Sequence, residues 1–189
     1  ESKVDRYEDE LGTYLVKLNN KDLSEKDSHS VSIMLHCIGD FERISDHAVN
    51  IMESARELHE KNLSFSAEAR TELQVLVSVV GRIVDTAYEV FDKQDMNLTR
   101  DVEPLEEMVD ELSREMKRRH VNRLRSGECT IEMGFILTDL ITSLERIADH
   151  CSNISVCVTQ VRENLYDTHS HLESLQNEPE EGYYNRLEE

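Results

Sequence analysis

Apolar side chains recur at steps of three and four residues along most of the chain. This spacing places them on one face of an α-helix. Only six glycines and two prolines occur, and no Asn-Gly or Asp-Gly hairpin signal is present. The pattern therefore predicts an all-α fold, with helices over residues 1–18, 29–61, 66–92, 98–124 and 130–165.

The lengths of these segments predict an elongated architecture. A helix of about 30 residues is about 45 Å long and needs equally long partners, which favours antiparallel bundles. We expect breaks at 19–28, 62–66, 93–97 and 126–129, and Pro104 near the start of its helix, where a proline costs least. Residues 166–189 lose the periodicity, so we expect a loose tail or one short helix there.

Composition and charge exclude several classes of protein. The 189 residues are 38% apolar, which is enough for one domain or two small ones with a core. Forty acidic and 21 basic residues give a net charge of −19, which disfavours nucleic acid as a partner. No run approaches the roughly 18 apolar residues that a membrane span needs, so we expect no membrane insertion of this segment. The four cysteines form no Cys-x-x-Cys pair, which favours reduced thiols and a cytoplasmic location.

The chain contains an internal repeat. Residues 42–51 match residues 145–154 at seven of ten positions, an offset of 145 − 42 = 103. Upstream, the pair Glu1 and Asp5 corresponds to Glu106 and Asp110 at an offset of 106 − 1 = 105. The sequence therefore predicts a duplicated helical unit. We expect residues 1–61 to form the first repeat, with two helices and truncated at its start, and residues 62–165 to form the second, with three.

Two pairs of acidic residues at i and i+4 lie within the repeated stretch, Glu42 with Asp46 and Glu145 with Asp149. Each pair shares a helix face beside the apolar stripe, where two like charges repel unless a cation lies between them. Oxygen ligands favour Mg²⁺, Mn²⁺, Ca²⁺ or iron, whereas participation of His47 or His150 would favour zinc. The alternative is a solvated acidic face that binds nothing.

The neighbours of these pairs are expected to support them. His47 and His150 follow the aspartates by a step of about 100° around the helix, so we expect them to make hydrogen bonds beside the ligands. Arg43 and Arg146 are expected to orient or neutralise acidic groups across helices. Asn50 and Asn153 extend the same helix face by four residues.

Several catalytic motifs are absent from the sequence. It contains no Glu-x-x-His, no Walker-type glycine loop, no nucleophile elbow and no His-Glu-x-x-His. We therefore expect no enzyme. A metal-dependent phosphohydrolase and a purely structural interaction module remain as alternatives.

The repeated stretches Phe-Glu-Arg-Ile-Ser-Asp-His (41–47) and Leu-Glu-Arg-Ile-Ala-Asp-His (144–150) resemble the signature of the PhoU family. The resemblance implies two pseudo-symmetric three-helix bundles and clusters of iron, zinc, Mn²⁺ or Mg²⁺. By position in the motif, the implied metal ligands are Glu1, Asp5, Glu42, Asp46, Glu106, Asp110, Glu145 and Asp149.

Residues 102–112, 119–124 and 166–169 are more similar to the PhoU-like domain of bacterial Na⁺/phosphate cotransporters. This likeness implies a cytoplasmic domain of an inner-membrane protein, which regulates phosphate uptake through the membrane portion of the same chain. The alternative is a free-standing PhoU that regulates an ABC phosphate importer and its sensor kinase. Both alternatives allow the chain to form a homodimer.

Overall fold

The computed structural model describes residues 1–163, which form five helices connected by short loops. The predicted all-α fold is confirmed. The helices are α1 (Ser2–Asn19), α2 (Glu25–Glu60), α3 (Ala67–Lys93), α4 (Met96–Arg125) and α5 (Ile131–Glu163). The predicted tail and the extension of the last helix to Leu165 lie outside the described residues. No helix in residues 1–163 is both long enough and apolar enough to cross a lipid bilayer.

Two of the predicted breaks are shorter in the structure, because polar caps start the helices before the apolar stripe begins. The Ser24 hydroxyl accepts a hydrogen bond from the Asp27 N–H, so α2 begins four residues earlier than 29. The Asp95 carboxylate accepts one from the Asn97 N–H and starts α4. Gln94, at a left-handed φ of 51°, is the only other residue between α3 and α4.

The prediction that Pro104 lies near the start of its helix is wrong. Because α4 begins at Met96, Pro104 lies inside the helix, beyond the first two turns. Its ring is fully buried. Burial of the ring in the core offsets part of the cost of an interior proline.

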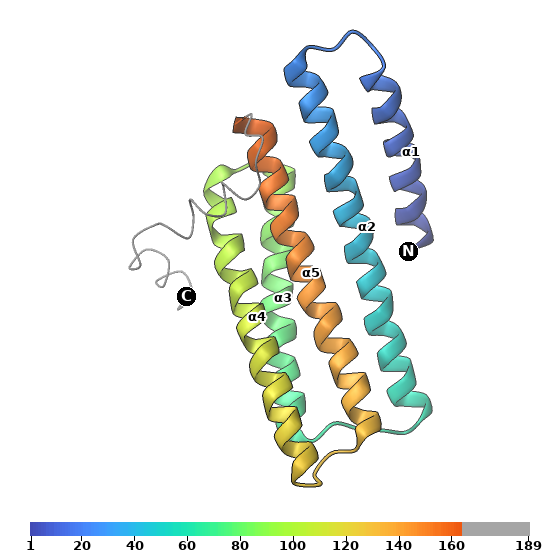
Figure 1. The fold of residues 1–189 in the computed structure, drawn as a ribbon, viewed down its shortest axis with the longest axis vertical. Coiled ribbons are helices and arrows are strands. Elements are labelled where there is room, and N and C mark those ends of the chain that lie inside the picture. The colour runs from blue at the N-terminus through green and yellow to red at the C-terminus, as the bar shows by residue number, and fades with distance from the viewer. Residues whose placement is uncertain (164–189) are drawn as a thin grey trace.

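The helices pack as an antiparallel pair beside a three-helix bundle (Figure 1). α1 runs along α2, and α3, α4 and α5 contact one another. The two units join through α2 and α5, which lie along each other and run in opposite directions. Since α2 and α5 carry the two copies of the repeated stretch, the duplicated sequences meet at the centre of the molecule.

The main core fills the interior of the three-helix bundle, and a smaller cluster lies between α2 and α5. The largest fully buried side chains of the main core include Leu76, Ile83, Val90, Val109, Leu137 and Ile141. Met34 on α2 is apolar but 43% exposed. It lines an open groove whose lining comes mainly from α1, α2 and α5.

Candidate metal centres

The first cluster of acidic side chains joins α1 to α2. It consists of Asp5 on α1 with Glu42 and Asp46 on α2. One carboxylate oxygen from each residue lies within 4.8 Å of the other two, and all three residues are partly buried. The Asp5 Oδ1 atom is buried and has no hydrogen-bond partner. A buried carboxylate oxygen without a donor is costly, and a cation would remove that cost.

The second cluster joins α4 to α5 in the same way. It consists of Glu106 and Asp110 on α4 with Asp149 on α5, again with oxygens within 4.8 Å of one another and partly buried. The repeat relates Asp5 to Asp110 and Asp46 to Asp149. The third member differs, since Glu42 completes the first cluster and Glu106 the second. Each cluster therefore uses three of four equivalent positions, but not the same three.

Three carboxylates of the clusters, Glu42, Glu106 and Asp149, resist ionisation when no cation is bound. Burial, followed by the charges of four neighbouring carboxylates, raises the pKa of Glu106 to about 8. The pKa of Glu42 is raised by burial and then by Asp46. Burial also raises the pKa of Asp149, and Arg146 opposes this shift. A bound divalent cation would favour the ionised forms instead.

The two arginines of the repeat lie on the same helix as their acidic partners, and the expectation that they act across helices is wrong. Arg43 contacts Glu42 and Asp46, each at 3.5 Å, and Arg146 contacts Asp149 at 3.3 Å. Both arginine side chains are more than 60% exposed. Exposed ion pairs of this kind contribute about 0–1 kcal/mol to stability, so they only partly offset the repulsion between the carboxylates of each cluster.

Two of the eight implied ligands lie outside the clusters. Glu1 is exposed and precedes α1, where its backbone carbonyl accepts hydrogen bonds from the N–H groups of Val4 and Asp5. The Glu145 carboxylate instead contacts the Lys117 ammonium group at 2.6 Å. With the offset of 105, the position equivalent to Lys117 in the first repeat is Gly12, which has no charge to offer. Glu42 is therefore free of such a lysine and completes its cluster.

The two histidines also lie outside both clusters, so the argument for zinc that depended on them is not supported. His150 Nδ1 is 2.8 Å from an oxygen of Asp40, and the Asn153 amide donates to the same oxygen at 3.2 Å. His47 stacks on His150 with ring centroids 5.8 Å apart. Burial and then His150 lower the pKa of His47. His150 and Asn153 thus join α5 to Asp40 on α2, whereas His47 Nδ1 is buried without a hydrogen-bond partner. A role of the two histidines in supporting the metal ligands stays a prediction.

Sequence reasoning missed three charged groups near the clusters, Asp40, Glu103 and Lys117. Asp40 has Ser143 as its repeat equivalent, so the repeat gave no signal for it. Glu103, whose pKa is raised by burial, accepts a hydrogen bond from Ser152 at 3.0 Å beside the second cluster. Lys117 has Gly12 as its repeat equivalent, so the alignment of the repeats gave no signal for its contact with Glu145.

A family model described as the PhoU domain matches residues 1–55 and 73–158, which is most of the chain. The chain belongs to the PhoU family. Two curated PhoU homologues are similar to it, each described as a phosphate-specific transport system accessory protein. The one from Thermotoga maritima is 29% identical over 115 residues, or 61% of this chain and 49% of the relative. The one from Deinococcus radiodurans is 23% identical over 133 residues, or 69% and 60%.

A solved PhoU structure has the same fold. The crystal structure of PhoU from Pseudomonas aeruginosa superposes with a TM-score of 0.71 at 22% identity, covering 87% of this chain and 81% of that chain. The present chain spans about half to three fifths of the length of the two curated relatives. The likeness therefore fixes the PhoU fold of the described helices.

Proposed function

We propose that this PhoU domain binds divalent cations at its two acidic clusters and regulates phosphate uptake. The observation that supports the proposal is the convergence of repeat-related aspartates from different helices, Asp5 with Asp46 and Asp110 with Asp149. Three oxygens at this spacing suit a hard cation such as Mg²⁺, Mn²⁺ or iron. The buried, unpartnered oxygen of Asp5 also favours a bound cation over a solvated acidic face.

A cation in either cluster would act as a clamp between two helices of one repeat. In the first cluster it would join α1 to α2, and in the second α4 to α5. It would also neutralise part of the net charge of −19. A clamped, less negative surface can bind a partner with less loss of conformational entropy than a loosely held one. Metal binding would thus bias the conformation of a transporter that the domain contacts.

We propose two partners for this domain. One is the cytoplasmic surface of a phosphate importer, and the other is the sensor kinase that works with that importer. This choice rests on the two relatives, which are described as accessory proteins of phosphate-specific transport systems. Attachment to a Na⁺/phosphate cotransporter stays a prediction that no comparison tests. An accessory role also fits the absence of a catalytic motif in the sequence better than a phosphohydrolase does.

Metal binding can be tested on each cluster separately. We expect wild-type protein to bind Mn²⁺ at two sites, and Asp5→Asn and Asp149→Asn each to lose one of them in a calorimetric titration. Mn²⁺ at about 100 times its dissociation constant should raise the free energy of unfolding by about 2.7 kcal/mol for each occupied site. Glu111→Gln, an exposed change on α4, is the control and should keep both sites. Wild-type melting that is insensitive to Mn²⁺ and to chelator would leave the clusters as solvated acidic faces.

The regulatory step needs a cellular measurement. Full-length protein with Asp46→Asn and Asp149→Asn should lose control of phosphate uptake when phosphate is abundant, whereas Glu111→Gln should retain it. If the double variant binds no metal and its phosphate uptake stays normal, the metal sites of the wild-type protein do not regulate transport.

Lys117 should weaken the second cluster, because it holds Glu145 away from the cation. Lys117→Met is expected to free this carboxylate as a further ligand and to raise the Mn²⁺ affinity of that cluster about tenfold, since affinity follows the charge of the ligand set. Competition titration against a fluorescent chelator measures the change. Arg114→Met removes an equal charge from an exposed position of α4 and is the matched control. An equal gain in both variants would mean that net charge alone is responsible.

A further inference from the structure

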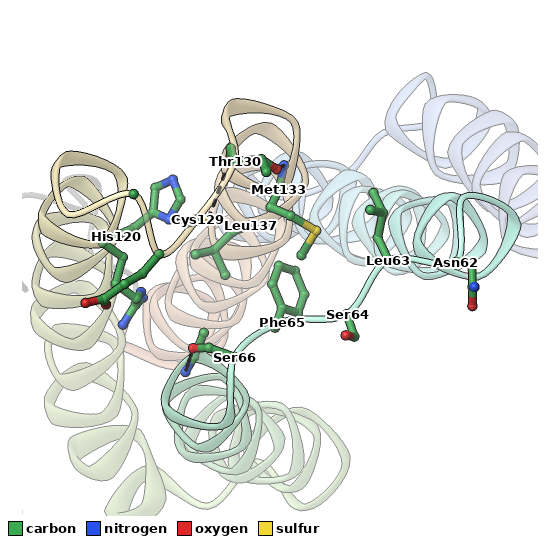
Figure 2. Close-up of a pocket in the computed structure, with 14 residues that line it drawn as sticks. Asn62, Leu63, Ser64, Phe65, Ser66, His120, Cys129, Thr130, Met133 and Leu137 are labelled. Atoms are coloured by element: carbon green, nitrogen blue, oxygen red, sulfur yellow. Dashed lines mark hydrogen bonds between the residues drawn. The ribbon is translucent and has the colours of Figure 1, made fainter.

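A pocket of about 380 Å³ lies at the end of the three-helix bundle, away from both acidic clusters. The loop between α2 and α3 and the loop between α4 and α5 close it, and its lining includes Phe65, His120, Cys129 and Met133. Figure 2 shows His120 beside the loop that carries Cys129, with Phe65 and Ser66 across the pocket. The metal proposal does not use any of these residues.

Cys129 and His120 form a thiol–imidazole pair in this pocket. The Cys129 sulfur lies 3.8 Å from His120 Nδ1 and 3.5 Å from the backbone oxygen of Thr130. His120 is only 6% exposed, and its Nε2 atom is buried without a hydrogen-bond partner. The ring is held against Gly134, where an added Cβ atom would come within 2.5 Å of Nε2. The fixed ring leaves Nδ1 facing the thiol.

The neutral ring of His120 has a nitrogen that can accept the thiol proton. Burial, and then the charge of Arg123, lower the pKa of His120, so the ring is neutral at pH 7. The other charged groups on the pocket lining are Arg123, which is paired with Glu72 at 2.9 Å, and Glu128. A neutral imidazole within reach of a thiol is the usual arrangement for generating a reactive thiolate.

The other three cysteines are more deeply buried than Cys129. Cys37, Cys151 and Cys157 are 5%, 1% and 8% exposed, respectively. Burial raises the pKa of Cys151 to about 12. Cys129 is partly exposed and lies in a loop, so it is the accessible thiol of the described residues.

We propose that Cys129 is a reversible modification site that forms mixed disulfides with small disulfides of the glutathione type. His120 Nδ1 takes the proton of the Cys129 thiol, and the thiolate sulfur attacks one sulfur of the small disulfide. A new S–S bond joins Cys129 to that half, while the original S–S bond breaks and its electron pair leaves with the other half. The released thiolate takes the proton from His120. Cys129 is oxidised, the small disulfide is reduced, and the pocket holds the attached group.

Oxidised glutathione is the probe, and the rate of adduct formation is followed by intact mass and peptide mapping. We expect one glutathionyl group on native wild-type protein, at Cys129, and none on Cys129→Ser. His120→Gln should react at least about tenfold more slowly. Gly134→Ala should slow the reaction as well, by displacing the ring without removing it. His59→Gln, which changes an exposed histidine of α2, should react like wild type.

The same reaction in concentrated urea separates chemistry from folding. In urea, wild type and His120→Gln should react at equal rates. Thermal melting should show that these two proteins are both folded in buffer. The proposal is overturned if folded His120→Gln reacts at the wild-type rate. It is also overturned if Cys37, Cys151 or Cys157 is modified as fast as Cys129 in the native protein.

Discussion

Lowering the pH from about 8.5 to about 5.5 is expected to stabilise the metal-free protein by about 3 kcal/mol through Glu106 alone. The pKa of Glu106 is about 8 in the folded protein and 4.5 for an ordinary glutamate. Between these values the folded state binds a proton that the unfolded state does not, so acidification favours folding. The stabilisation is fully present below the unfolded value and is lost as the pH rises through about 8.

The measurement is urea unfolding of chelator-treated protein across this pH range. Glu106→Gln carries a neutral side chain at every pH, so it should be more stable than wild type by about 4–5 kcal/mol near pH 8.5 and by about 1 kcal/mol near pH 5.5, and equal to it only below the unfolded pKa of 4.5. Glu111→Gln, at an exposed position of the same helix, should follow the wild-type curve. The histidines with lowered pKa values, His47 and His120, act in the opposite direction at acid pH but do so in all three proteins.

A bound cation should abolish this dependence. Mn²⁺ competes with the proton for Glu106, so in metal-loaded wild type the carboxylate is ionised in both the folded and the unfolded state near pH 8, and the loss of stability with rising pH should disappear. Parallel pH curves for wild type and Glu106→Gln would show that Glu106 ionises like an ordinary surface glutamate. The cluster would then lack the repulsion that a cation is proposed to relieve.

The helices and the repeat could be predicted because both are local properties of the sequence. The apolar stripe of α3 is buried in the core at Leu76, Val80, Ile83 and Val90. The starts of α2 and α4 were placed too late because their first residues follow from capping at Ser24 and Asp95. The spacing of apolar residues does not locate a polar N-cap, which lies before the first apolar residue of the stripe.

The composition of the clusters could be predicted only in part. The i, i+4 spacing brings Glu42 to Asp46 and Glu106 to Asp110, but which helix supplies the third ligand depends on packing. Lys117 removes Glu145 from the second cluster through a contact between α4 and α5 that the spacing along one helix does not reveal. Cys129 and His120 have no repeat equivalents and meet only when the loop folds back on α4.

Replacing Arg123 by Met is expected to destabilise the protein by about 3 kcal/mol. Arg123 on α4 makes a two-pronged contact with Glu72 on α3, at 3.0 and 2.9 Å, and both side chains are only 12% exposed. Breaking a largely buried pair from one side costs about 3–5 kcal/mol, because the remaining charge stays buried without its partner. Arg119 lies 3.4 Å from Glu72 and can compensate part of the loss, which places the expected effect at the lower limit.

The double variant Glu72→Met/Arg123→Met distinguishes this explanation from loss of packing. If the unpaired Glu72 charge is the cause, removing it should recover most of the lost stability, as judged by urea unfolding. Arg118→Met removes one partner of the exposed pair with Glu115 and should cost about 1 kcal/mol or less. If Arg123→Met alone lowers the free energy of unfolding no more than Arg118→Met does, the Arg123–Glu72 pair does not hold α3 to α4. The end of the bundle, with the Cys129 pocket that Arg123 lines, would then depend on apolar packing alone.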